Sequence, residues 1–111
     1  MMRLSYLWVV ALLGLGGLGG CDSGGSPTGS TCDTASVLTW ETYGQPFMKG
    51  YGTDCHSEYG NVDRLRRGAA GIDLYAGSGQ KATNTVMPKS GSKPSLEERQ
   101  QLSAWLACGA P

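Results

Sequence analysis

The residues of this chain with the greatest chemical potential are Cys55 and His56, which are adjacent in the stretch YGTDCHSEYG. His56 is the only histidine. A structural zinc site needs four ligands, and a blue-copper site needs two histidines and a cysteine, so neither fits. A cysteine–histidine nucleophile pair needs side chains that face each other, which adjacent residues rarely provide. The pair is therefore either part of a site for covalent cofactor attachment or an accidental neighbour pair.

The five residues that end in this pair read GTDCH, from Gly52 to His56. Sites of covalent haem attachment read Cys-x-x-Cys-His. The match is complete except at the first position, where Gly52 replaces a cysteine. Cys55 therefore offers at most one thioether bond to a haem, and His56 stands where the motif has its histidine.

Residues 1–20 are predicted to be a signal peptide. A basic start is followed by an apolar run from Leu4 to Leu18, which is shorter than the ~20 residues of a membrane-spanning helix. The sequence Leu18-Gly19-Gly20-Cys21 resembles the lipobox of bacterial lipoproteins, with an ordinary signal peptide as the alternative. Lipidation of Cys21 would anchor the protein to a membrane of the cell envelope, facing the periplasm or the exterior.

Residues 21–31 are predicted to be the lipidated cysteine and a flexible tether, because the segment DSGGSPTGST has no apolar side chains to bury. Folding is therefore assigned to residues 32–111. Without residues 1–20, eight basic and nine acidic residues remain, a formal charge of −1. No basic patch stands out, and no nucleic-acid partner is expected.

The domain has few residues that form a core. Val, Ile, Leu and Phe number eleven from Cys32 onward, and small domains commonly need a disulfide, a metal or a cofactor to be stable. With Cys21 lipidated, three cysteines remain, and any disulfide leaves one unpaired. Cys32 opens the folded region and Cys108 nearly closes it, so a disulfide between them would join its ends. The unpaired thiol is then Cys55.

Two helices are predicted to position these residues. The first begins at Gln45-Pro46 and ends near Asp54, with Trp40 and Tyr43 in an extended segment before it. The second begins after Ser95, which forms a capping box with Glu98. Its apolar stripe contains Leu102, Trp105 and Leu106, and Gly109 follows its last turn.

The glycine-rich region between the two helices is weakly periodic, and at most one short helix, near Tyr75–Val86, is predicted there. Ala76–Thr83 is interpreted as a linker-like loop, since it lacks the spacing of a phosphate-binding loop. Met87-Pro88 lies just before the last helix, and Met87 taken alone is a typical core filler. A basic cluster is interpreted as a solvated face, or else as a contact for haem propionates or an acidic partner: Arg64, Arg66 and Arg67.

Together, these residues resemble a small bacterial cytochrome c, over about Cys32 to Pro111. TWETYGQPFMKGY precedes the attachment motif as in the short lipoprotein-type members, and MP and then PSLEERQQLSAWLACGAP follow it. The resemblance implies a mostly α-helical, cytochrome c-like domain with glycine-rich loops. It also implies haem as the cofactor, with Cys55 forming the thioether, His56 the proximal iron ligand and Met87 the distal one.

The resemblance implies a one-electron carrier, not an enzyme, that exchanges electrons with redox partner proteins of the envelope. The haem would fill the sparse core, flanked by Phe47, Tyr51 and Trp105. Because of Gly52, three outcomes stay open: haem held by one thioether, haem held without a covalent bond, or no haem. In the third case, the chain is a degenerate cytochrome-fold lipoprotein that acts as a tethered interaction module.

Overall fold

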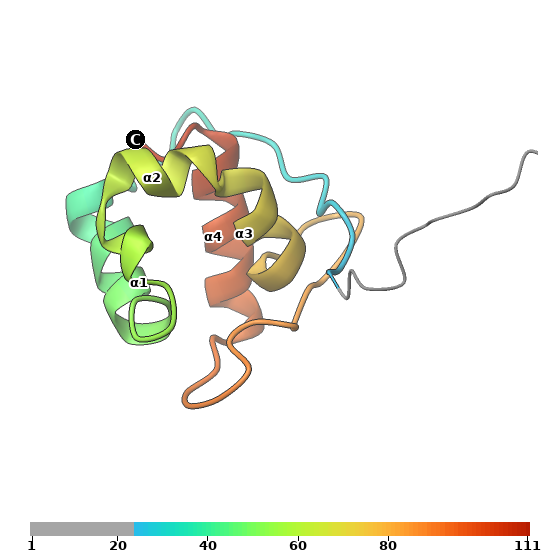
Figure 1. The fold of residues 1–111 in the computed structure, drawn as a ribbon. Helices are drawn as coiled ribbons and strands as arrows, with labels where there is room; N and C mark the ends of the chain where they lie inside the picture. Colours follow the sequence, from blue (N-terminus) through green and yellow to red (C-terminus); the bar gives the residue numbers. More distant parts are fainter. Residues whose placement is uncertain (1–23) are drawn as a thin grey trace, which may run out of the picture.

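The computed structural model describes residues 24–111, so the predicted signal peptide and Cys21 lie outside the described residues. The described part is mostly helical, as predicted, and it has no strands apart from an isolated bridge between Ser78 and Thr83. Figure 1 shows α4 in the middle, with α1 on one side, α2 across one end and α3 packed beside α4. In this part of the chain, no helix is long and apolar enough to cross a membrane.

The first helical stretch begins earlier than predicted, with the π-helical turn η1 at Trp40–Gly44. The Thr42 N–H donates to the Thr39 hydroxyl at 3.2 Å, and the Thr39 N–H donates to the Thr42 hydroxyl at 3.1 Å. This reciprocal capping stabilises a helix start. The prediction that Trp40 and Tyr43 are extended is therefore wrong.

Helix α1 spans Gln45–Tyr51 and continues η1 without a break. Pro46 lies in its first turn, where the missing N–H is tolerated, as predicted. The N–H groups of Gly52 and of the next residue both donate to the Met48 carbonyl, each at 2.8 Å. These bonds close the last turn, so the predicted extension of the helix to about Asp54 is wrong.

Three helical elements follow that the sequence analysis did not predict. They are η2 (Ser57–Gly60), α2 (Val62–Arg67) and α3 (Ala69–Ala76). The Asn61 side chain caps α2, because its Oδ1 accepts a hydrogen bond from the Arg64 N–H at 3.1 Å. The predicted short helix near Tyr75–Val86 is wrong, since α3 ends at Ala76 and the chain then continues as an irregular loop.

Helix α4, Leu96–Ala107, has the start that the sequence predicts. The Glu98 N–H donates to the Ser95 hydroxyl at 3.1 Å, and the Ser95 N–H donates to the Glu98 carboxylate at 3.1 Å. The capping box is therefore confirmed. After the helix, Gly109 has a φ of 86°, a left-handed conformation that glycine adopts at little cost.

The core centres on Trp105, whose side chain is 1% exposed. The centroid of its ring system lies 6.4 Å from that of Trp40 and 5.6 Å from that of Tyr43. Gly44 is required for this packing, because a Cβ there would lie 2.4 Å from the Trp105 ring. The buried apolar residues are Phe47, Met48, Leu65, Ile72, Ala76, Leu102, Trp105, Leu106 and Ala110.

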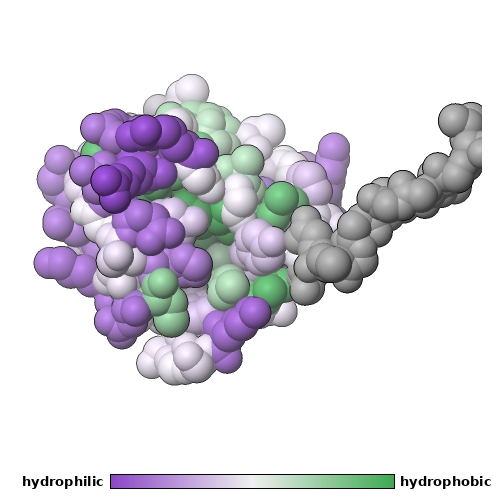
Figure 2. Space-filling model, viewed as in Figure 1, coloured by the Kyte–Doolittle hydropathy of each residue, from purple (hydrophilic) through white to green (hydrophobic). Residues whose placement is uncertain are grey.

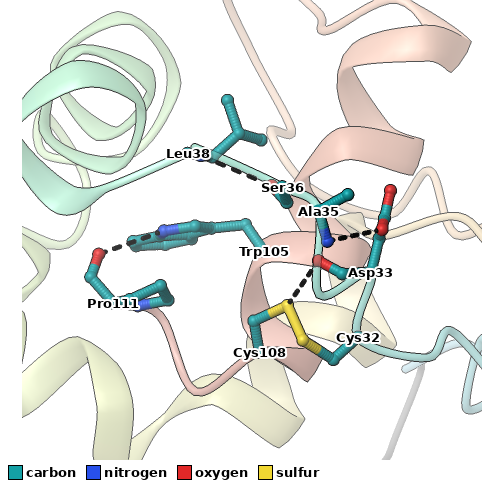
Figure 3. Close-up of a disulfide and its surroundings, with 8 residues drawn as sticks. All are labelled: Cys32, Asp33, Ala35, Ser36, Leu38, Trp105, Cys108 and Pro111. Carbon is teal, nitrogen blue, oxygen red and sulfur yellow. Dashed lines mark hydrogen bonds between the residues drawn. A yellow bond between two sulfur atoms is a disulfide. The ribbon is translucent and has the colours of Figure 1, made fainter.

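A disulfide joins Cys32 to Cys108, with Cα atoms 4.6 Å apart, which confirms the predicted pairing (Figure 3). The neighbouring C-terminus is also held, since the Trp105 indole N–H donates to the Pro111 carbonyl at 3.3 Å. Cys55 is the free cysteine of the described residues, and it is exposed.

The segment before Cys32 differs from the prediction. Thr28 is 1% exposed, and its hydroxyl and N–H both donate to the Asp73 carboxylate, at 2.8 and 3.1 Å. The Gly25 N–H donates to the Leu74 carbonyl at 2.9 Å. The prediction of a tether that buries nothing is therefore wrong for residues 24–31. Hydrogen bonds, in place of apolar burial, attach them to the domain.

Candidate functional site

A cavity of about 680 Å³ lies between α1, the turn that follows it, α3 and the loop before α4. This volume is within the range of pockets for small molecules and cofactors. In Figure 2, apolar surface is visible in the hollow between the elements, while hydrophilic residues gather over α1 and α2. The apolar and aromatic residues of the lining include Phe47, Met48, Tyr51, Tyr59, Ile72, Tyr75, Ala76 and Val86.

Cys55 and His56 lie in a tight turn after α1. The N–H groups of both residues donate to the Gly52 carbonyl, at 3.3 Å for Cys55 and 2.9 Å for His56. Two donors on one carbonyl curl the backbone at this point, and both residues line the cavity. Because the Cys55 thiol is free and exposed, it is accessible for a covalent bond to a molecule in the cavity.

The orientation of the His56 ring is set by two neighbours. Its Nδ1 lies 3.4 Å from a carboxylate oxygen of Glu58, and its ring stacks on Tyr59 with centroids 5.3 Å apart. Histidines that bind metals commonly hold a carboxylate at one nitrogen and the metal at the other. Nε2 is therefore the nitrogen left for a ligand. Partial burial, and then the Glu58 charge, raise the pKa of the Tyr59 phenol.

Met87 lines the same cavity from the loop that precedes α4. Its N–H donates to the Tyr75 carbonyl at 2.8 Å, and its carbonyl accepts a hydrogen bond from Nη1 of Arg99 at 2.9 Å. The peptide bond from Met87 to Pro88 is cis. The backbone of Met87 is thus held on one side by the end of α3 and on the other by α4.

The structure brings together the three residues that the sequence assigns to the cofactor, Cys55, His56 and Met87. Phe47 and Tyr51, two of the residues predicted to flank a haem, also line the cavity. Trp105, the third, does not line it, because it is enclosed by η1 and the C-terminus.

The basic cluster on α2 is not part of the cavity lining. Nε of Arg66 donates to the Ala110 carbonyl at 3.1 Å, and Nε of Arg67 donates to the Asp63 carbonyl at 3.3 Å. The cationic residue in the lining is instead Lys89, which the sequence analysis did not single out. Lys89 follows Met87 by two residues, and this proximity is the feature of the sequence that could have identified it.

The donors in the cavity fit a haem. A thiol, an imidazole and a thioether are the groups that c-type haems take from proteins, and the macrocycle supplies the other iron ligands. In residues 24–111, no group of three His, Cys, Asp or Glu residues is placed to hold a metal ion without such a macrocycle. The position of the missing thiol, Gly52, also lines the cavity. A Cβ at Gly52 would lie 3.0 Å from Sδ of Met48.

No protein-family model, no curated protein and no solved structure matches this chain. What the protein does must therefore be inferred from the residues that line the cavity. The order of these residues along the sequence is the second basis for that inference.

Proposed function

We propose that this protein is a haem-binding one-electron carrier that is tethered to the cell envelope. The observation that carries the proposal is that Cys55, His56 and Met87 line one cavity. Three helical elements separate the turn of Cys55 and His56 from the loop of Met87, so sequence proximity does not explain why they meet. A mostly apolar cavity with three such donors suits a large, flat, apolar cofactor with a metal at its centre.

Each residue has a separate role in this proposal. The Cys55 thiol would hold the cofactor through one thioether bond. Nε2 of His56 would be one iron ligand, with Glu58 at Nδ1 of the same ring. The Met87 sulfur would be the other protein ligand, and a soft thioether ligand favours the reduced metal. Phe47, Tyr51 and the other apolar residues exclude water.

When bound, haem supplies the one-electron chemistry, and the chain sets the reduction potential and the access of solvent. The proposed role is therefore that of a carrier and not of an enzyme. Its partners are redox proteins of the envelope.

The envelope location depends on residues outside the described part of the chain. The support for it is the lipobox-like sequence before Cys21, which predicts a lipid anchor and export. The disulfide between Cys32 and Cys108 is compatible with an oxidising compartment outside the cytoplasm.

Gly52 favours a second candidate function, since one of the two attachment thiols is missing. In that case the domain binds no haem and serves as a tethered interaction module. Cys55 is then a free, exposed thiol that is open to oxidation.

One experiment separates the two candidates. The protein is expressed in a bacterium with c-type maturation enzymes, and its reduced and oxidised spectra and its pyridine haemochrome are recorded. A Soret band that survives acid–acetone extraction, with an α-band between the positions of two-thioether and non-covalent haem, is the expected result. Extractable haem would mean non-covalent binding, and the absence of a Soret band would leave the interaction module.

The iron ligands are tested with matched variants. Both Met48 and Met87 line the cavity. Replacement of Met87 by Leu is expected to abolish the methionine-to-ferric-iron charge-transfer band, whereas replacement of Met48 by Leu is expected to retain it. His56→Ala should remove the low-spin spectrum both in the Met87→Leu protein and in the Met48→Leu protein. The opposite pattern for the two methionines would assign the distal ligand to Met48.

A further inference from the structure

Arg99 is a buried cation whose guanidinium is bound by backbone carbonyls. It lies on α4 and is 4% exposed. Its Nη1 donates to the carbonyls of Ala76 at 2.9 Å, Asn84 at 3.1 Å and Met87 at 2.9 Å. A buried charge is costly unless hydrogen bonds compensate it, and bonds to a charged donor are stronger than neutral ones.

These three carbonyls lie at the start and in the middle of the loop between α3 and α4. Ala76 is the last residue of α3, where the helix dipole favours a cation, and Asn84 and Met87 lie near the middle of the loop. Further backbone bonds hold the same loop, from the Ser78 N–H to the Arg99 carbonyl at 3.1 Å and from the Asn84 N–H to the Gly77 carbonyl at 2.8 Å. Arg99 thus connects α4 to a loop that has no regular secondary structure of its own.

Met87 is the residue of this loop that faces the cavity and is also bonded to Arg99. Its N–H is bonded to the Tyr75 carbonyl, so the peptide groups on both sides of Met87 are fixed. Bonds at both peptide groups fix the direction of the Cα–Cβ bond of Met87, from which its thioether extends. A ligand fixed in this way binds with less loss of conformational entropy than one on a mobile loop.

We propose that Arg99 is the positioning residue for Met87, and that it holds this thioether at the cavity before the cofactor is bound. The inference rests on the proposed function, since it assigns a purpose to Met87 that only a metal cofactor requires. Arginine suits the task because its planar guanidinium is pre-organised and loses little conformational freedom for each hydrogen bond, whereas lysine has a compact ammonium group on a flexible stem.

The first test uses amide hydrogen exchange of the haem-free full chain. In Arg99→Gln, exchange at Met87 should accelerate about tenfold relative to exchange at Leu102 in the core of α4. The matched control is Ser103→Ala on the same helix. Ser103 is 1% exposed, and its hydroxyl donates to the Asp73 carboxylate at 2.6 Å and not to a carbonyl of the Met87 loop. This control should leave the ratio between Met87 and Leu102 unchanged.

The second test uses the haem-loaded protein. Arg99→Gln should weaken the methionine charge-transfer band and lower the reduction potential part of the way towards Met87→Leu, while Ser103→Ala changes neither. Arg99→Lys, which keeps the charge, should fall between Arg99→Gln and the wild type. It also serves as the test variant if Arg99→Gln does not fold.

The outcomes separate this inference from the proposed function. If the wild type carries haem with the methionine band, and the Arg99 variants keep both the band and the potential, Arg99 has only a structural role. If the wild type binds no haem, the proposed function is wrong, and the hydrogen bonds of Arg99 only stabilise the loop. Equal exchange at Met87 in the wild type and in the Arg99 variants would overturn the positioning role in either case.

Discussion

Thr28 and Asp73 are joined by a hydrogen bond of 2.8 Å from the Thr28 hydroxyl to the Asp73 carboxylate, across 45 positions of sequence. The same carboxylate also accepts a hydrogen bond from the Ser103 hydroxyl on α4 at 2.6 Å. Asp73 therefore links the N-terminal segment, α3 and α4. Because Thr28 is 1% exposed, the segment before the disulfide is part of the folded domain.

Replacement of Thr28 by Val should lower the free energy of unfolding by about 1–3 kcal/mol. The change keeps the size of the side chain but removes a buried donor to a charged acceptor. Urea denaturation followed by tryptophan fluorescence measures the effect. Thr31→Val, at an exposed position of the same segment, should change stability by less than about 0.5 kcal/mol. Equal effects at the two positions would mean that the segment is not attached to the domain.

Removal of the disulfide by the double change Cys32→Ser and Cys108→Ser should destabilise the domain by about 4–5 kcal/mol. The cross-link closes a loop with a sequence separation of 76, and such a loop restricts the unfolded chain strongly. The expected readout is a lower denaturation midpoint, which a reducing agent should reproduce in the wild type. Cys55→Ser is the control, since Cys55 is free and exposed. A loss of unfolding free energy below about 1 kcal/mol would show that other effects offset the entropy that the disulfide removes from the unfolded chain.

Local signals predicted some of the elements that local bonds create, but not α2, whose Asn61 cap is equally local. The capping box of Ser95 and Glu98 involves residues three apart, and it located the start of α4 correctly. Pro46 also lies in the first turn of α1, as predicted, although the helical stretch itself begins earlier, at Trp40. The reciprocal cap of Thr39 and Thr42 is a local signal of the same kind, but with two threonines in place of the usual pair with Glu, and it was missed.

Non-local bonds account for most of what the sequence did not reveal. Thr28 is buried by partners on α3, and nothing in its neighbourhood in the sequence predicts that contact. Arg99 lies in the charged run EERQQ, which is typical of an exposed helix face, yet its guanidinium is enclosed by a distant loop. For the site, the adjacency of Cys55 and His56 was informative, because the attachment motif contains that pair, whereas Met87 lies outside the motif.

The stability of the domain should depend on pH below about 5 through Glu98. Hydrogen bonds from the Ser95 backbone N–H and then from the Tyr51 hydroxyl hold the pKa of Glu98 below its ordinary value of 4.5. The folded state therefore favours the ionised form. The resulting stabilisation is fully present above pH 4.5 and is lost as the pH falls through the lowered pKa of the folded state.

Glu98→Gln should remove this pH dependence. At neutral pH the loss should be about 1 kcal/mol or less, because the capping carboxylate is partly exposed. The difference in unfolding free energy between wild type and variant should then shrink as the pH is lowered from 6 to 3, in steps of about one unit. Glu97→Gln, on the exposed neighbour, is the control. A difference that stays constant over this range would contradict the assignment to Glu98.

Replacement of Gly52 by Cys should restore a second attachment thiol and convert a single-thioether haem into a double one. The backbone at Gly52 has a φ of −123°, outside the left-handed region that favours glycine. The Cβ would lie 3.0 Å from Sδ of Met48, at the flexible end of a side chain that can shift. After co-expression with maturation enzymes, the α-band of the pyridine haemochrome should move to the two-thioether position.

Gly52→Ala is the matched control, since it introduces the same Cβ without a thiol. It should bind haem with the single-thioether band, and any loss of haem in this variant measures the cost of the contact with Met48. In the double variant Gly52→Cys, Cys55→Ser, the thiol at position 52 is the only thiol left in the attachment motif. If Gly52→Cys carries haem but keeps the single-thioether band, position 52 does not face the vinyl group. The fit of the turn to the attachment motif would then be wrong, even though Cys55 and His56 line the cavity.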